Sequence, residues 1–211
     1  MPDRSGTRRP RVVYRQQNHG WRGRPLFAAL GMRQAYAQHS EPEGDLLRRY
    51  VSGRSTVVEI GVAEGGSAWE AARVMSSSAH LYLIDPYFDR SVRGLSAAKI
   101  TARRAVNSVA QARVEWIEKF SHEAVTGWTT PIDFLFIDGD HTYEGVRRDW
   151  KDWTPHLAPG GLVALHDAHP DGPWTEPDHG PVRLFSELRE DPSWRLVDHA
   201  DTLVVLERRD T

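Results

Sequence analysis

The chain has 211 residues, of which 39% are hydrophobic and 27% are charged, and it has no cysteine. A chain of this length is expected to form one domain, and the composition excludes disordered and collagen-like proteins. The lack of cysteine excludes disulfides and thiolate metal sites. No apolar run reaches the roughly 20 residues that a membrane-spanning helix needs. The N-terminal arginines are not followed by an apolar segment typical of a secretory signal, so we expect a cytoplasmic protein.

The N-terminus differs in charge from the rest of the chain. Residues 1–24 contain seven arginines and one aspartate, a net charge of +6, which leaves −8 for the remaining residues. Prolines and glycines are also frequent there, so residues 1–25 are predicted to form a basic arm or lid. Tyr14 and Trp21 could close such a lid over a pocket. We expect residues 26–211 to form the single folded domain.

Three helical patterns are visible. Residues 27–36 have a rough apolar face, and Asp45 can cap a second helix that continues to residue 51. Residues 143–157 place large apolar side chains at spacings of four, three and four, which predicts an amphipathic helix.

Short apolar runs alternate with helical segments from residue 56 onward. They cover residues 56–61, 80–85, 114–117, 132–138, 161–167, 194–199 and 202–207. The alternation of the first five runs with helices is typical of a doubly wound, mostly parallel Rossmann-like sheet that is covered on both faces. Only Ala200 and Asp201 separate the last two runs, so these should form an antiparallel C-terminal hairpin. The sequence therefore predicts a seven-stranded α/β domain.

A glycine-rich turn follows the first predicted strand. The segment from Glu59 to Ser67 contains three glycines and leads directly into a helix, and Asp85 ends the next strand 24 residues after Gly61. Ligands of such sheets bind at the carboxyl ends of the strands, and an acid at this spacing is typical of a ribose contact. Glu59 and Glu64 suit a cationic ligand better than a pyrophosphate. We expect a nucleoside-containing ligand at this turn.

Two further strands end in aspartates. Asp138 follows the fourth strand and Asp167 the fifth, and neighbouring strands are about 4.8 Å apart. Two bare carboxylates would repel each other, so something positive should lie between them. Oxygen ligands favour Mg²⁺ or Mn²⁺. His141 follows Asp138 by three residues and is the expected general base. His166, His169 or water could supply a third metal ligand, and the sequence leaves this choice open.

These segments together resemble a known family. The glycine-rich turn, Asp85, the segment 136–146 (FIDGDHTYEGV) with Asp149, and the pair His166-Asp167 are similar to those of class I S-adenosylmethionine-dependent methyltransferases. Among these, the sequence most resembles the small-molecule O-methyltransferases that include the macrocin type of sugar O-methyltransferase. The resemblance extends over about residues 45–207.

The resemblance implies roles for individual residues. Glu59 and Gly61 would line the methionine part of S-adenosylmethionine, and Ser67 belongs to the same cofactor-binding turn. Asp85 would bind the ribose hydroxyls and Ser121 would lie near the adenine. The residues expected at the reacting end are two aspartates that hold a divalent ion, the first also contacting the cofactor, and a histidine base: Asp138, Asp167 and His141.

The expected acceptor is a small molecule, first of all a carbohydrate with neighbouring hydroxyls. Catechol-type relatives have Asn after the second aspartate, where this chain has Ala168, so a catechol is less expected. Trp174, in a proline-rich insertion, could contact a sugar ring. The sequence leaves the oligomeric state open, a homo-oligomer included.

Three alternatives remain at this stage. A nicotinamide-dependent oxidoreductase could use the same fold, but the turn lacks the diphosphate glycine pattern and no Tyr-x-x-x-Lys pair follows the fourth strand. An iron oxygenase could use His141, Asp167 and His169 as metal ligands, but such a site is expected on a fold other than the parallel α/β sheet predicted here. A module that binds nucleic acid or a partner is supported by the basic arm alone, so we do not expect nucleic acid.

Overall fold

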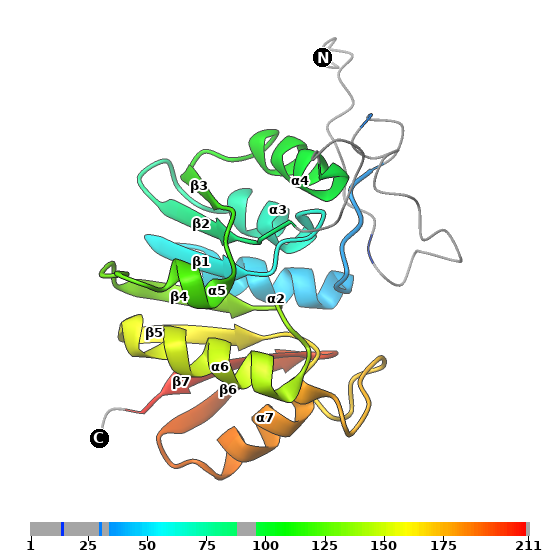
Figure 1. Ribbon diagram of the computed structural model, residues 1–211, viewed down its shortest axis with the longest axis vertical. Coiled ribbons are helices and arrows are strands. Elements are labelled where there is room, and N and C mark those ends of the chain that lie inside the picture. The colour runs from blue at the N-terminus through cyan, green and yellow to red at the C-terminus, as the bar shows by residue number, and fades with distance from the viewer. Residues whose placement is uncertain (1–13, 15–29, 31–33, 88–95, 210–211) are drawn as a thin grey trace.

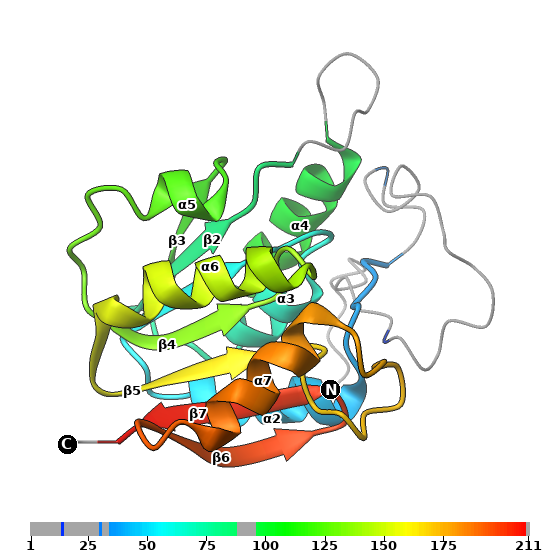
Figure 2. The ribbon, with the colours of Figure 1, turned by 60° about the horizontal axis from the view of Figure 1, so that its bottom comes forward.

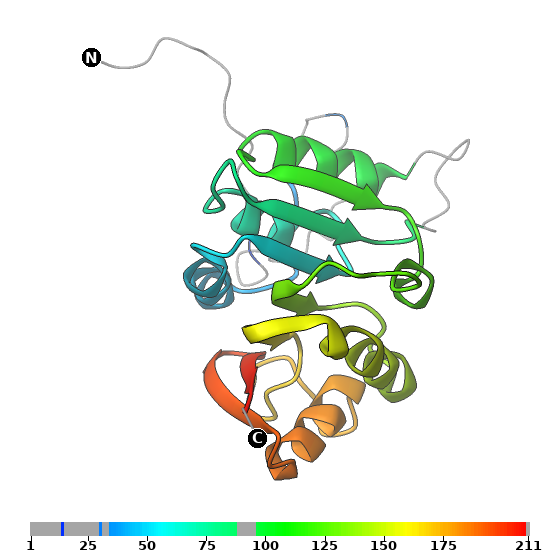
Figure 3. The same ribbon diagram turned by 90° about the vertical axis from the view of Figure 1, so that its left-hand side faces the viewer.

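The computed structural model describes residues 14, 30, 34–87 and 96–209. Within them, seven strands form one sheet in the order β3-β2-β1-β4-β5-β7-β6 (Figure 3). The strands are β1 (Thr56–Ile60), β2 (His80–Ile84), β3 (Arg113–Ile117), β4 (Ile132–Ile137), β5 (Leu157–Leu165), β6 (Trp194–Ala200) and β7 (Leu203–Arg208). Strands β1 to β5 pair in parallel, and β7 is antiparallel to both β5 and β6. The predicted sheet with its C-terminal hairpin is confirmed.

Helices cover both faces of the sheet (Figures 1 and 2). The described helices are α2 (Glu41–Val51), α3 (Gly66–Ala72), α4 (Ala97–Asn107), α5 (Ser121–Ala124), α6 (Tyr143–Trp153) and α7 (Gly180–Glu190). Apolar side chains of α2, α3 and α4 pack on one face with alternate strand residues such as Val57. Those of α6 and α7 pack on the other face with the intervening residues, such as Val58. This alternation explains why the strand sequences are apolar throughout.

The first described helix begins earlier than the sequence pattern predicted. Ser40, not Asp45, is the N-cap of α2, and its side chain accepts a hydrogen bond from the Glu43 amide. The Glu43 side chain accepts from the Ser40 amide in return, which completes a capping box. The Ser-x-x-Glu spacing was the sequence signal for this start. Of the predicted helix 27–36, the described residues Ala35 and Tyr36 are not helical, and most others lie outside the described residues.

The boundary between α6 and β5 also differs from the prediction. The helix ends at Trp153, and a short 3-10 turn covers Thr154–His156, where Pro155 cannot continue the helical hydrogen bonds. Leu157, predicted as the last helical residue, instead opens β5 and pairs with Ile132. Strand β5 therefore begins four residues before the predicted run.

The predicted arm lies outside the described residues except for Tyr14, and Trp21 is among those not described. The Tyr14 hydroxyl donates a hydrogen bond to Glu70 on α3, and its ring lies edge-on to His39, with 5.7 Å between the centroids. The lid hypothesis therefore stays a prediction. Among the described helices, none has both the length and the apolar character required to span a membrane.

Candidate active site

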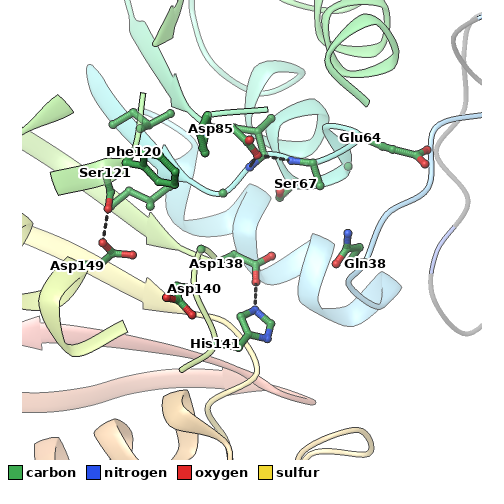
Figure 4. Close-up of a pocket in the computed structure, with 18 of the residues that line it drawn as sticks. Gln38, Glu64, Ser67, Asp85, Phe120, Ser121, Asp138, Asp140, His141 and Asp149 are labelled. Atoms are coloured by element: carbon green, nitrogen blue, oxygen red, sulfur yellow. Dashed lines mark hydrogen bonds and ion pairs between the residues drawn. The ribbon is translucent and has the colours of Figure 1, made fainter. Parts of the chain in front are cut away.

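A pocket of about 720 Å³ opens at the carboxyl ends of β1, β2 and β4 (Figure 4). The sheet order reverses here, because β2 lies on one side of β1 and β4 on the other. Six of the predicted site residues line this pocket: Gly61, Ser67, Asp85, Ser121, Asp138 and His141. The fold thus brings together residues that are up to 80 positions apart in the chain.

The glycine-rich turn lies directly against the end of β4. Gly61 has a φ of +84°, and a Cβ added there would lie 2.0 Å from the carbonyl oxygen of Asp138. The Gly61 amide donates to the carbonyl of Ile84 at 2.9 Å, and the Asp138 amide donates to that of Ile60 at 2.8 Å. Only glycine fits this position, and the turn and the Asp138 loop form one continuous wall.

Asp85 supports this turn. One carboxylate oxygen accepts hydrogen bonds from the amides of Val62 and Ala63, both at 2.9 Å, and the other accepts from Tyr87 at 2.8 Å. The side chain therefore lies at the pocket wall beside the first turn, and its predicted contact with a ribose stays a prediction.

Glu59 lies beneath the pocket rather than on its surface. Its side chain is 2% exposed and accepts a hydrogen bond from the Ser67 hydroxyl at 2.6 Å. Burial raises the pKa of Glu59 to about 8, with Asp138 and Asp85 adding to the rise and Ser67 opposing it. Glu59 therefore holds a proton at neutral pH and positions Ser67, which does line the pocket.

His141 lies between the two aspartates predicted to face each other. Its Nε2 is 3.2 Å from Asp138 Oδ1, and its Nδ1 is 3.7 Å from Asp167 Oδ2. The hydrogen bond to Asp138 raises the pKa of His141, against the effect of burial. The side chain keeps 43% of its surface exposed, so a ligand can reach it. Asp167 lies behind His141 and does not line the pocket.

A buried histidine contacts the same aspartates from behind. His166 Nδ1 is 3.1 Å from Asp138 Oδ1 and 3.7 Å from Asp167 Oδ2, and its Nε2 is 3.5 Å from Glu43 Oε2. Burial would lower the pKa of His166, but the carboxylates around it raise that pKa well above the usual value. Burial would likewise raise the pKa of Asp138, but His166 and His141 hold it well below its usual range.

In this structure the imidazoles of His141 and His166 lie beside Asp138 and Asp167, and the carboxylates raise the pKa of both rings. Within the described residues, no group of three His, Asp or Glu side chains is arranged to hold a metal ion. His169, considered as a third ligand, instead stacks on His199 with 4.3 Å between the ring centroids. The metal prediction is therefore not confirmed.

The far end of the pocket lies around Ser121. Its hydroxyl donates to the carboxylate of Asp149, a buried side chain on α6, and the exposed Phe120 ring lies next to it (Figure 4). Burial raises the pKa of Asp149, and Ser121 opposes this. A hydroxyl, a carboxylate and an aromatic ring could together contact a planar heterocycle. Trp174, predicted to contact a sugar, does not line this pocket.

One wall of the pocket comes from a segment that sequence reasoning missed. Tyr36, Gln38 and His39 line the pocket just before α2, and the Tyr36 amide donates to Glu64 Oε2 at 2.9 Å. Figure 4 shows Gln38 on the side of His141 that faces away from Ser121. The capping box that starts α2 could have indicated a non-helical segment here, but nothing in the sequence indicated that it borders the pocket.

Residues 58–168 match the family described as "Methyltransferase domain". A segment of 47 residues is 38% identical to the uncharacterized protein y4gI of Sinorhizobium fredii. That match covers 20% of this chain and only 5% of the curated relative, so it spans a small part of both proteins.

Solved structures of similar fold cover most of the chain. The cofactor-bound Rv0187 protein from MTB has a TM-score of 0.67 at 17% identity, with 89% of this chain and 88% of that chain covered. A putative O-methyltransferase from Klebsiella pneumoniae has a TM-score of 0.65 at 18% identity, and 88% of each chain is covered. The O-methyltransferase TomG from Streptomyces achromogenes, in complex with SAM, has a TM-score of 0.61 at 19% identity, again with 88% of each chain covered. At these identities the similarity establishes the fold.

Proposed function

Because the chain belongs to the methyltransferase domain family, we propose that it transfers a methyl group from S-adenosylmethionine to a hydroxyl of a small acceptor. The observation that carries this proposal is the position of His141. A half-exposed imidazole, held by Asp138 and Asp167, borders the same pocket as the glycine-rich turn. A general base beside a cofactor pocket suits an acceptor whose proton must be removed.

The residues of the pocket fit this cofactor. The glycine-rich turn at Gly61 lines the pocket and is held against the Asp138 loop, because the lack of a Cβ lets the two backbones meet. Glu64 and Asp138 line the walls and suit a sulfonium cation. Asp85 would contact the ribose hydroxyls, while Ser121 would lie near the adenine. TomG, of the same fold, binds SAM, which also supports the proposal.

The proposed chemistry depends on His141. Bound S-adenosylmethionine would supply an electrophilic methyl group. In the neutral ring of His141, Nε2 donates to the Asp138 carboxylate, so Nδ1 is the nitrogen that accepts the proton of the acceptor hydroxyl. The hydroxyl oxygen takes the methyl group as the sulfur–methyl bond breaks, and Asp138 and Asp167 stabilise the positive charge formed on the ring. Their contacts at 3.2 and 3.7 Å fix the ring in the pocket wall. Holding the acceptor oxygen in line with the methyl group would lower the activation barrier further, by about 7 kcal/mol or more for ideal orientation.

We propose a carbohydrate with neighbouring hydroxyls as the acceptor class. Aliphatic hydroxyls are weakly acidic, so they need a base more than catechols do. This agrees with the resemblance of the segment 136–146 to sugar O-methyltransferases. Nicotinamide chemistry is not favoured, because the turn lacks the diphosphate glycine pattern.

Dependence on Mg²⁺ or Mn²⁺ stays a prediction from the sequence, and no step above uses a metal. If Asp138 and Asp167 hold a divalent ion, chelation should abolish turnover and added Mg²⁺ or Mn²⁺ should restore it. Full turnover in the presence of a chelator would show that His141 and His166 are sufficient to balance the negative charge of the two carboxylates.

Calorimetry with S-adenosylmethionine, S-adenosylhomocysteine and NAD tests the cofactor. We expect the two sulfur compounds to bind and NAD not to bind, and Asp85→Ala to weaken binding strongly. Preferential binding of NAD, or an unchanged dissociation constant in Asp85→Ala, would contradict the assignment.

Methyl transfer to a panel of methyl glycosides tests the base. His141→Ala should keep the affinity for S-adenosylhomocysteine while kcat falls by about 10²- to 10⁴-fold, the usual effect of losing a general base. A variant with wild-type kcat would show that the proton leaves to water without this imidazole.

A further inference from the structure

A second histidine of the pocket has no role in the chemistry above. His39 lies immediately before the N-cap of α2 and is 3% exposed, yet it lines the same pocket as His141. Its Nδ1 lies 2.9 Å from the carbonyl oxygen of Ser40. A carbonyl oxygen can only accept, so Nδ1 carries the proton and donates. In the neutral ring, Nε2 is therefore a bare acceptor.

This acceptor lacks a partner. Among the residues that the structure describes, nothing forms a hydrogen bond with His39 Nε2. Buried polar atoms in proteins are nearly always paired, and an unpaired one costs about 1–3 kcal/mol. The ring cannot relieve this by taking up a proton easily, because burial lowers the pKa of His39 and the nearby His166 lowers it further, against Glu70 and Glu43.

The location indicates which part of a ligand lies nearby. His39 follows Gln38, which lies near His141 and away from Ser121 and Asp149 (Figure 4). The reacting groups, rather than the heterocycle, are expected at this end. A cofactor amino group and an acceptor hydroxyl both belong there, and both carry the hydrogen that Nε2 can accept.

We propose that His39 Nε2 accepts a hydrogen bond from an N–H or O–H group of the molecule bound at the His141 end of the pocket. This inference rests on the proposed function. The donor is either the ammonium group of the cofactor's methionine part or a hydroxyl of the acceptor. In both cases His39 is a ligand-binding and specificity-determining residue, and His141 remains the base.

Two isosteric substitutions separate this role from a structural one. The amide of His39→Asn can replace Nδ1 toward Ser40 but places nothing at Nε2. His39→Gln can place an amide oxygen close to the Nε2 position. The Ser40 carbonyl also accepts from the Gly44 amide at 3.0 Å, so it stays paired in either variant. The control is His199→Leu, because His199 is an exposed histidine on β6.

The first measurement is calorimetry of the full chain with S-adenosylhomocysteine. If the ammonium group is the donor, His39→Asn should bind about 10- to 100-fold more weakly, as expected for a hydrogen bond with a charged group, and His39→Gln should recover part of the affinity. If an acceptor hydroxyl is the donor, affinity for S-adenosylhomocysteine should not change. In that case, KM for methyl glycosides should rise about 3- to 10-fold in His39→Asn with little change in kcat.

Imidazole ¹⁵N NMR provides a readout that a structural role would not affect. In the ligand-free protein, Nε2 of His39 should show the shift of an unprotonated, unbonded nitrogen. It should move upfield when S-adenosylhomocysteine is added, or when methyl glycosides are then added to that complex. A protonated Nε2 in the free protein, or no movement in both titrations, would overturn the proposal. Failure of the wild-type protein to bind S-adenosylhomocysteine would instead contradict the proposed function.

Discussion

Glu43 offers the sharpest test of the charge network behind the site. Its carboxylate accepts hydrogen bonds from the Ser40 amide at 2.6 Å and the Thr202 amide at 2.8 Å, and from the Thr202 hydroxyl. It also lies 3.5 Å from Nε2 of His166, and the side chain has no exposed surface. Glu43→Ala would therefore release the start of α2 from the turn between β6 and β7 and leave His166 without this partner.

The size of the effect follows from the pKa of Glu43. Burial would raise it, but His166 and the Thr202 and Ser40 donors lower it to about 2, from 4.5 for a free side chain. At about 1.4 kcal/mol for each pKa unit, this is about 3 kcal/mol of stability at neutral pH. Breaking a buried ion pair typically costs about 3–5 kcal/mol. We expect Glu43→Ala to lose about this amount, which would lower Tm by roughly 6–20 °C for a chain of this size.

Urea unfolding of the wild type, Glu43→Ala and Glu41→Ala checks this at a series of pH values. Glu41 is the control because it is exposed in the same helical turn. Since the pKa of Glu43 is lowered on folding, its contribution is complete above about pH 4.5 and is lost as the pH falls toward 2. The stability gap between the wild type and Glu43→Ala should shrink over this range. A Glu43→Ala protein as stable as Glu41→Ala at pH 7 would refute the reasoning.

Three further predictions concern the pocket. Gly61→Ala should destabilise the protein far more than Gly53→Ala in thermal unfolding. Both glycines have positive φ, but an added Cβ would meet the Asp138 carbonyl at Gly61 and nothing within 4 Å at Gly53. Equal losses of stability would contradict the close approach of the two backbones at Gly61. Because folding raises the pKa of Glu59 to about 8, the stability of the wild type should decrease as the pH rises from about 4.5 to 8. Glu59→Gln should remove this part of the decrease. Since Asp138 raises the pKa of His141, kcat should increase with pH through a value above 6.5, and Asp138→Asn should move this rise to lower pH; an unmoved rise would assign it to another group.

The local features of this protein could be predicted from the sequence because they depend on neighbouring residues. Alternation of apolar runs and helical stripes predicted the doubly wound sheet, and the two-residue gap at Ala200 and Asp201 predicted the hairpin. The glycine-rich turn predicted a pocket at the end of β1. His141 and Asp138 could be paired because one loop contains both. The start of α2 was misplaced only because the Ser40 capping box was not used.

The surroundings of the site were decided by the tertiary structure. The sequence predicted a metal between Asp138 and Asp167, which stays a prediction, and only the fold shows that His141 lies between these carboxylates and His166 behind them. Glu43 contacts both His166 and Thr202, which lies 159 residues away in the chain, because the fold packs the start of α2 against them. The charge state and the free hydrogen-bonding atoms of a buried group depend on such distant contacts. For this reason the unpaired Nε2 of His39, and with it the wall opposite Ser121, could be found only from the folded chain.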